Sequence, residues 1–200
     1  MGARILCIAG SPRRNGNNDR VLAALEEGVR SVGGEVDHLI AASSGVNPCR
    51  GCNSCSKDGR CIQRDAMDDI YARIDAADGI AIATPVYFAT VPAVLKILYD
   101  RCQPYWARRY VLGEPAPQVR RPGALLVVRG GGDPFGSECA KMPTKSVLAV
   151  LGAEIVESVE ALADRAGEID RHAEILAEAT AIGARLATEA ERRRGLREGV

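Results

Sequence analysis

The chain has 200 residues, of which 46% are hydrophobic and 26% are charged, and this composition is typical of one soluble globular domain. Its 26 Lys and Arg residues balance 26 Asp and Glu residues, so nothing in the charge indicates nucleic acid or an anionic membrane as a partner. No apolar run approaches the roughly 18 to 20 residues that span a bilayer, and the first one is too short for a signal peptide. We therefore expect a cytoplasmic protein, in which clustered cysteines serve as metal ligands or redox groups rather than disulfides.

Short apolar runs alternate with helical patterns along the chain, which predicts βα units around a parallel sheet. Residues 4–9 are the first expected strand. The loop 10–18 then leads into a helix for which Asn17 or Asn18 is the expected cap. Residues 35–40 alternate between apolar and polar side chains and form the second expected strand.

The middle of the chain combines a cysteine-rich loop with the next βα unit. The cysteines lie in a loop at about residues 47–64, after which Asp65 is expected to cap a short helix. Residues 79–84 form a third, buried strand, and a helix follows at 93–102. We expect residues 103–121, with their prolines and polar breaks, to be an irregular excursion.

The last part of the chain completes the sheet. A fourth strand is expected at 123–128, a helix at 138–151, a fifth strand at 154–159 and a final helix at about 168–191. Five strands that alternate with helices predict an α/β fold, with a doubly wound five-stranded parallel sheet and helices on both faces. We expect residues 1–200 to form a single domain.

Doubly wound sheets bind ligands at the carboxyl ends of their strands. The loops expected there are 10–18, 84–92 and 129–137. The first loop opens a helix, where backbone N–H groups favour a phosphate. Its candidate residues are Ser11, Asn17 and Asn18 as donors, Gly10 and Gly16 for close approach, and Arg13 or Arg14 for charge. The loop lacks G-x-G-x-x-G and G-K-[ST], and a capped turn without a ligand is an alternative interpretation.

Four of the seven cysteines follow the pattern C-x2-C-x2-C-x5-C, at Cys49, Cys52, Cys55 and Cys61. Bacterial ferredoxins open with the same C-x2-C-x2-C run, whereas a structural zinc site usually has two C-x2-C knuckles separated by a longer loop. Gly59 lets the chain turn back, so that all four thiolates serve one [4Fe–4S] cluster. A zinc site, a disulfide and a remnant without metal are the alternatives.

The segments "GSPRRNGNN" and "ADGIAIATPVYFATVPAVLKILYDR" resemble the flavodoxin-like, FMN-binding NAD(P)H reductases. With the cysteine block added, the chain resembles the iron–sulfur flavoproteins of that superfamily over about residues 4–160. The resemblance implies an FMN whose phosphate contacts the first loop. That phosphate would lie on Ser11, Arg13, Gly16, Asn17 and Asn18. The flavin ring would lie against Pro85, Val86, Tyr87 and Phe88, with the loop Gly130 to Asp133, including Gly131 and Gly132, closing over its edge.

The resemblance also implies a flavin-dependent oxidoreductase. Electrons would pass between a donor, such as a ferredoxin-like protein or NAD(P)H, and an acceptor such as a quinone, oxygen or peroxide. The sequence contains no Ser/His/Asp set and no paired-carboxylate site, so we expect no catalytic side-chain acid or base. One alternative is an NAD(P)H-dependent FMN or quinone reductase without a working cluster. A zinc-binding or labile-cluster scaffold is the other.

An oligomer is implied by the same resemblance, because the cluster and the flavin that exchange electrons would come from different subunits. We therefore expect a homodimer or a homotetramer. The segment 103–118, with Trp106 and Tyr110, is the candidate interface surface.

Overall fold

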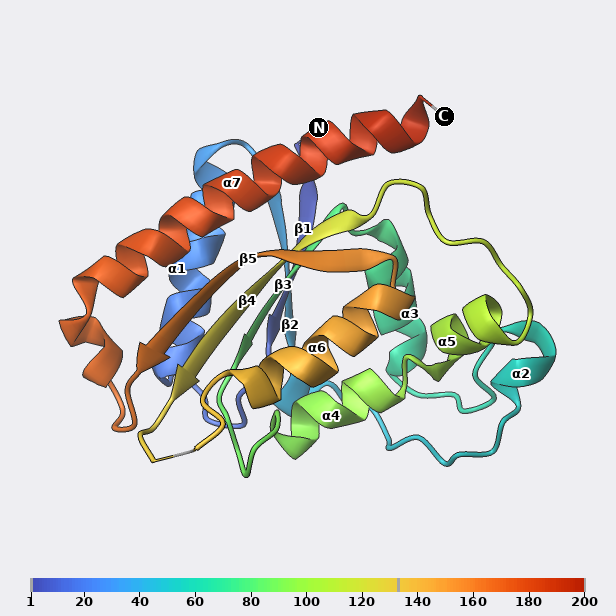
Figure 1. Cartoon of the computed structure of the whole chain (residues 1–200), viewed down its shortest axis with the longest axis horizontal. Helices are drawn as coiled ribbons and strands as arrows, with labels where there is room; N and C mark the ends of the chain where they lie inside the picture. The colour runs from blue at the N-terminus through green and yellow to red at the C-terminus, as the bar shows by residue number, and fades with distance from the viewer. Residues whose placement is uncertain (1, 133, 200) are drawn as a thin grey trace.

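A five-stranded parallel sheet forms the centre of the structure, a computed structural model that describes residues 2–132 and 134–199 (Figure 1). The strands are β1 (Arg4–Ala9), β2 (Glu35–Ile40), β3 (Gly79–Thr84), β4 (Arg121–Arg129) and β5 (Ala153–Leu162). Their spatial order is β2-β1-β3-β4-β5, and every neighbouring pair is parallel. This is the flavodoxin-like order, in which the chain reverses its winding direction between β1 and β3.

Helices cover both faces of the sheet, as the alternating pattern predicts. They are α1 (Asn17–Ser31), α2 (Cys55–Asp58), α3 (Met67–Ala76), α4 (Ala93–Asp100), α5 (Gln103–Tyr110), α6 (Glu138–Val150) and α7 (Ala173–Glu198), with 3₁₀ turns η1 (Ala41–Ser43) and η2 (Glu168–Arg171). One buried cluster joins the sheet to α1 and α7, and a second joins it to α3, α4 and α6. The central strands are therefore buried on both sides, which explains their uninterrupted apolar runs.

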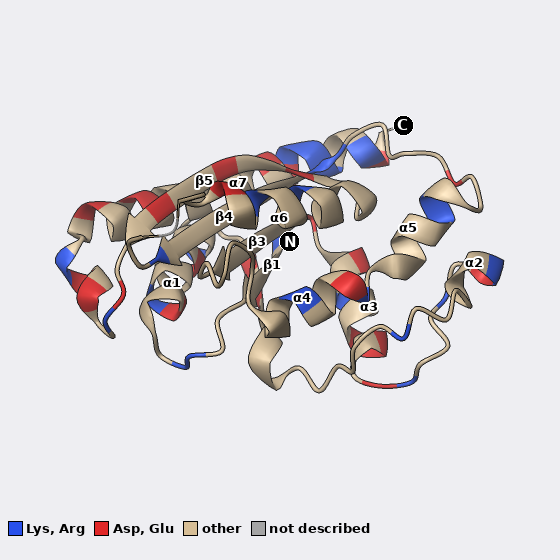
Figure 2. Cartoon of the chain, turned by 60° about the horizontal axis from the view of Figure 1, so that its bottom comes forward, with Lys and Arg blue, Asp and Glu red and all other residues tan. Residues whose placement is uncertain are grey.

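The structure confirms the first three predicted strands and, counting both ends, lengthens the fourth by three residues and the fifth by four. Among the described residues, no helix is long and apolar enough to cross a bilayer. Lys, Arg, Asp and Glu are interspersed along the helices (Figure 2), as the balanced composition suggests. The expected fold class is confirmed.

Two sequence-based boundaries are wrong. Residues 103–110 form helix α5 rather than an irregular excursion, because Pro104 occupies the first turn, where its missing N–H costs nothing, and Tyr105 and Ala107 are buried. The final helix begins at Ala173, five residues later than expected, because η2 first buries Ile169. The loop between α5 and β4 is irregular, as predicted.

Helices α1 and α7 approach each other through two glycines. A Cβ atom on Gly28 would collide with the Thr180 carbonyl oxygen, and one on Gly183 would collide with the Leu25 carbonyl oxygen. Both obstacles are backbone atoms, which cannot move without shifting a whole helix. The two glycines therefore set the distance between α1 and α7, which together cover this face of the sheet.

A Gly183→Ala variant is expected to lower the free energy of unfolding by about 1–3 kcal/mol, the usual cost of overpacking a well-packed contact. Gly195→Ala is the matched control on the same helix, because nothing lies within 4 Å of its Cβ position. That control should gain up to about 1 kcal/mol from helix propensity. Guanidinium unfolding followed by circular dichroism, at equal flavin content, measures both. Equal effects in the two variants would contradict the close helix contact.

Candidate functional site

A pocket lies where the loops after β1, β3 and β4 meet the segment after β5. Its enclosed volume is about 80 Å3. The lining residues are Ser11, Arg13, Gly16, Asn17, Asn18, Pro85, Val86, Tyr87, Val128, Arg129, Gly130, Ala163 and Asp164. All five first-loop residues expected to hold a phosphate are brought together here, with three of the four residues expected to face a flavin ring.

The first loop begins at the point where β1 and β3 are joined. The Gly10 N–H donates to the Ala83 carbonyl oxygen over 2.8 Å, and a Cβ atom on Gly10 would lie 2.6 Å from Leu95 Cδ2. The same Cβ atom would lie 2.9 Å from the Ala83 carbonyl oxygen, a backbone atom that cannot easily move, so this position favours glycine. The Ser11 hydroxyl then accepts the Arg13 N–H at 3.1 Å, and Asn15 turns the chain at φ 56°. The loop thereby delivers Gly16 to the start of α1.

Neither Asn17 nor Asn18 is the N-cap of α1, in contrast to the prediction. Gly16, not Asn17 or Asn18, precedes the first residue of α1. The Asn17 amide donates to the carbonyl oxygens of Ala163 at 3.1 Å and Arg165 at 2.8 Å, so it ties the first loop to the segment after β5. Its side chain is therefore committed to protein partners. The backbone N–H groups at the start of α1 have no acceptors within the helix, and such groups are suited to an anion.

Asn18 leaves a polar atom unpaired inside the pocket. Its amide nitrogen lies 3.5 Å from the Val128 carbonyl oxygen. Its Oδ1 is buried and has no partner among the residues that the structure describes. A buried acceptor without a donor is costly, so a ligand hydroxyl at this place would stabilise the pocket.

The second loop makes a tight turn whose strain is visible in the backbone. Tyr87 and Thr90 exchange two backbone hydrogen bonds, of 2.9 and 3.1 Å, across Phe88 and Ala89. Those two central residues have φ values of 48° and 54°, a conformation that glycine or asparagine would adopt more easily. Strain of this kind is found at ligand clamps. The Phe88 side chain is fully exposed and does not line the enclosed pocket, so its expected place against the ring stays a prediction.

The third loop contributes less than expected. Gly130 lines the pocket, whereas Gly131 and Gly132 are not among the lining residues. Asp133, which was also expected there, lies outside the described residues. Ala163 and Asp164 also line the pocket, although no motif marks them in the sequence. Their signal was available, since β5 is parallel to the other strands and its carboxyl end must reach the same edge of the sheet.

The four motif cysteines line a second, separate pocket of about 40 Å3. All four thiols are free, and Cys52 is the most exposed of them. The chain wraps around the pocket through left-handed turns at Gly51, Asn53 and Gly59, with φ values of 62°, 55° and 70°, while α2 packs against α5 beneath the loop. The structure thus collects the four cysteines around one small space.

The surroundings of the thiols differ. The N–H of Ser54 and then its hydroxyl lower the pKa of the Cys52 thiol, because both stabilise the thiolate. Burial raises the pKa of Cys55, and the negative charges of the other three cysteines raise it further. The nearness of the other thiols therefore opposes ionisation of Cys55 until cationic charge is supplied nearby.

Among residues 2–132 and 134–199, no group of three or more His, Cys, Asp or Glu side chains is arranged to hold a single metal ion. The cysteine side chains surround a space instead of converging on a point. Four thiolates are the donor set of both iron–sulfur clusters and structural zinc sites, so the donor type fits a metal group of either kind.

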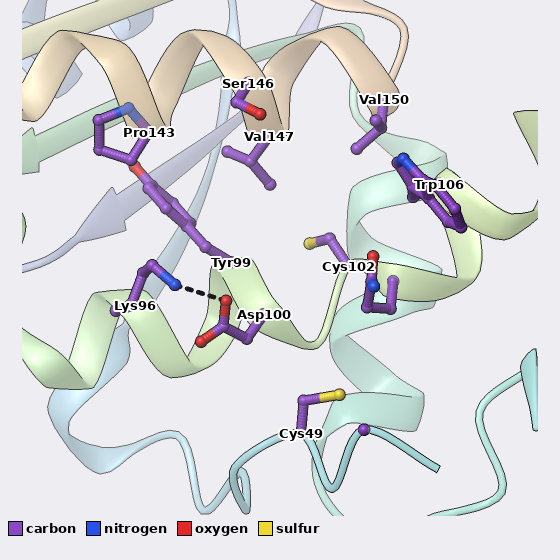
Figure 3. A pocket seen from close by; sticks show the side chains of 12 residues that line it. Cys49, Lys96, Tyr99, Asp100, Cys102, Trp106, Pro143, Ser146, Val147 and Val150 are labelled. Carbon is purple, nitrogen blue, oxygen red and sulfur yellow. Dashed lines mark hydrogen bonds and ion pairs between the residues drawn. The ribbon is translucent and has the colours of Figure 1, made fainter. Parts of the chain in front are cut away.

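A larger cleft of about 420 Å3 adjoins the cysteine pocket (Figure 3). Cys49 lies at its floor, Trp106 at one side and Val147 of α6 above, with the Lys96–Asp100 ion pair of 2.6 Å at its rim. Cys49, Gly51, Asp100 and Gln103 line both spaces. The cysteine loop is therefore approached from an open, partly apolar cleft.

Comparison with known proteins identifies the family. The family model described as NADPH-dependent FMN reductase matches residues 3–168. The chain belongs to this family.

Among curated members, an iron–sulfur flavoprotein of Archaeoglobus fulgidus is 35% identical over 64% of this chain and 55% of its own length. One of Methanosarcina thermophila is 40% identical over 49% of this chain and 51% of its own. The chain thus spans about half the length of these relatives. An iron–sulfur flavoprotein of Methanocaldococcus jannaschii is 34% identical over 68% of this chain and 65% of its own.

Solved structures agree on the fold. An NAD(P)H:quinone oxidoreductase from Methanothermobacter marburgensis superposes with a TM-score of 0.69 at 18% identity, over 93% of this chain and 98% of that one. A flavone reductase gives a TM-score of 0.67 at 20% identity, over 94% and 62%. At this level of identity, the likeness supports the flavodoxin-like fold of this chain and no specific activity.

The FMN reductase family implies FMN, and the first pocket fits that group. A helix N-terminus suits the phosphate, the unpaired Asn18 Oδ1 suits a ribityl hydroxyl, and Tyr87 with Pro85 offers ring surface. The enclosed volume of about 80 Å3 is far below the roughly 300–1,000 Å3 of pockets that enclose a drug-sized ligand. The enclosed part therefore suits the phosphate end, and a flavin ring would lie at the open mouth.

Proposed function

We propose that this protein is an FMN-dependent oxidoreductase that also carries a [4Fe–4S] cluster on Cys49, Cys52, Cys55 and Cys61. The observation that carries the proposal is the presence of two spaces in one chain: a pocket at the start of α1, at the switch point between β1 and β3, and a pocket lined by four free thiols. FMN exchanges hydride or single electrons and a cluster exchanges one electron, so the pair converts two-electron into one-electron chemistry.

The chain's own part in this reaction is binding and positioning. The start of α1 binds the phosphate through backbone N–H groups. The strained turn after β3 holds the Tyr87 backbone rigidly beside the ring, because the N–H of each of Tyr87 and Thr90 donates to the carbonyl oxygen of the other. The exposed mouth leaves room for a nicotinamide or a quinone to stack on the flavin. No side-chain acid or base is assigned a catalytic role.

The iron–sulfur assignment rests on the cysteine spacing, on the shared pocket and on the relatives. Three cysteines at two-residue gaps with a fourth after a glycine turn bring four thiols to one space. Several curated relatives at 34–40% identity carry the name iron–sulfur flavoprotein. A cluster here would accept electrons from a ferredoxin-like protein, with NAD(P)H as the alternative donor to the flavin. A quinone, oxygen or peroxide would be the final acceptor.

A homodimer or homotetramer is part of the proposal. Within one chain, α2 and the cysteine loop lie at the opposite end of the molecule from the carboxyl ends of β4 and β5 (Figure 1), and the two pockets share no residue. Close electron transfer therefore favours a flavin from a second copy. Helix α5 offers a contact surface, since Trp106 and Tyr110 are exposed and their rings are 5.7 Å apart. We place the assembly in the cytoplasm, where thiols stay reduced.

A second candidate is an NAD(P)H-dependent FMN or quinone reductase that has no working cluster. The family model itself favours it, because residues 3–168 match a model described by the reductase activity alone. It keeps the flavin pocket and treats the cysteines as a remnant.

Metal and flavin analysis of anaerobically purified protein separates these candidates. We expect about four iron, four acid-labile sulfide and one FMN per chain, with a brown colour and a broad cluster absorption under the flavin bands. FMN without iron or sulfide would support the second candidate. A colourless protein that binds neither group would contradict both and favour the zinc-binding scaffold.

A further inference from the structure

Arg101 is the largest fully buried side chain of the described residues, with 1% of its surface exposed. It directly follows α4 and lines the cysteine pocket. Burying a guanidinium is costly unless all of its charge is compensated. The hydrogen bonds of Arg101 therefore indicate which part of the structure this buried charge stabilises.

Among the described residues, four hydrogen bonds from Nη1 and Nη2 of Arg101 go to the segment 47–65, whereas Nε is buried without a partner. Nη1 donates to the carbonyl oxygen of Asn47 at 2.8 Å and to Oδ2 of Asp65 at 2.6 Å. Nη2 donates to Oδ1 of Asp65 at 3.1 Å and to the sulfur of Cys61 at 3.7 Å. The guanidinium thus contacts Asn47 at the start of the cysteine loop, Cys61 as its last cysteine and Asp65 just beyond its end.

Asp65 closes the same loop from the other side. It accepts the Asn47 N–H at 3.0 Å and the Asn47 side-chain amide at 3.2 Å, while its other oxygen accepts the Met67 N–H at 3.0 Å. The Arg101 hydrogen bonds hold the pKa of this carboxyl well below its usual range. The two ends of the 47–65 segment are thereby joined at a neck made by one buried ion pair.

We propose that Arg101 is a positioning residue that closes the cysteine loop before any metal is bound and donates an N–H···S hydrogen bond to the Cys61 thiolate once a cluster is present. The first role needs no cofactor. The second rests on the proposed function, and it would make the cluster easier to reduce, because a cationic donor stabilises the more negative reduced state.

Arg108 provides the control for a purely structural role. It also fastens the loop, since its Nε donates to the Gly59 carbonyl oxygen at 3.0 Å and its guanidinium lies 5.0 Å from the centre of the Tyr105 ring. No hydrogen bond from it to a cysteine is present among the described residues. An Arg108→Met variant should therefore loosen the loop without changing the environment of the cluster.

The first role is tested by limited trypsin digestion of the metal-free full chain, with fragments identified by mass spectrometry. The loop has exposed cleavage sites at Arg50, Lys57, Arg60 and Arg64. Arg101→Lys keeps one positive charge but loses the planar fork, and we expect its loop to be cut about tenfold faster than in the wild type. Asp65→Asn opens the same neck from the carboxylate side and should give the same direction. Unchanged cleavage in both variants would overturn the loop-closing role.

The second role is tested by redox titration of the reconstituted full chain with dithionite, followed by electron paramagnetic resonance. We expect Arg101→Lys to lower the ratio of reduced to oxidised cluster about tenfold at a fixed potential, which is a shift of about 59 mV to more negative values for one electron. Arg108→Met should keep the wild-type midpoint. Equal midpoints in Arg101→Lys and the wild type would overturn the hydrogen-bond role.

The two arms fail independently of the proposed function. A wild-type protein that takes up no iron contradicts the proposed function, yet the trypsin comparison still decides whether Arg101 closes the loop. A wild-type protein that takes up iron, with variants identical to it in both measurements, overturns this inference and leaves the proposed function standing.

Discussion

A Cys52→Ala variant is expected to lose its iron and acid-labile sulfide and to keep about one FMN per chain. Cys52 is the most exposed of the four motif cysteines, so its removal costs little packing. Three thiolates and an open position retain a cube poorly, whereas the flavin pocket has no residue in common with the cysteine pocket. Iron, sulfide and flavin assays on the anaerobically purified variant measure the effect.

Cys7→Ala is the matched control for that variant. Cys7 is fully buried in β1, where burial raises the pKa of its thiol far above the ordinary value. Cys7 packs among the residues that join the sheet to α1 and α7, and it does not line the cysteine pocket. The iron content of this variant should therefore stay at the wild-type level. If iron and FMN disappeared together from the Cys52→Ala protein, the two sites would not be independent.

The second large effect is expected from Gly16→Asp, at the residue that precedes α1 in the flavin pocket. Aspartate is a favoured residue at this helix position, and its Cβ atom would lie 3.5 Å from Arg13 Cβ, an ordinary contact. The fold should therefore be retained. The new carboxylate would occupy the helix N-terminus and repel a phosphate, and at about 4 Å this repulsion is large enough to weaken FMN binding roughly 100-fold or more.

Gly16→Asn supplies the neutral control, because asparagine caps helices as well as aspartate does but carries no charge. Fluorescence titration with FMN and with riboflavin separates charge from shape. Riboflavin has no phosphate, so its affinity should differ little between the Asp and Asn variants. Wild-type FMN affinity in Gly16→Asp would move the phosphate away from the start of α1.

Local pattern was sufficient for the sheet and for most of the flavin pocket. The predicted bounds of β1, β2 and β3 agree with the structure. β1 and β3 are buried on both faces and are therefore short uninterrupted apolar runs, whereas the partly exposed edge strand β2 is predicted from its alternation of apolar and polar residues. Once the strands are parallel, their carboxyl ends share one edge, so Ser11 and Tyr87 had to meet although 76 residues separate them in the sequence.

Local pattern failed where a side chain had two possible uses. Asparagine is a favoured helix cap, but the Asn17 side-chain amide hydrogen-bonds to the segment after β5 instead. Residues 103–110 contain a proline that suggested a break, and it begins helix α5 instead. In both cases a partner distant in sequence decided between two locally acceptable states.

The sequence by itself determined the strand positions, the loops that meet at the sheet edge and the four cysteines of the motif, because periodicity and spacing are local properties that burial imposes directly. Only the tertiary structure decided how the cysteine loop is held. Arg101 is 36 residues from Asp65 and 40 from Cys61, and in the sequence it looks like any charged residue at the end of a helix. A guanidinium becomes a buried clamp only when the folded chain removes it from water and brings its partners within hydrogen-bond distance.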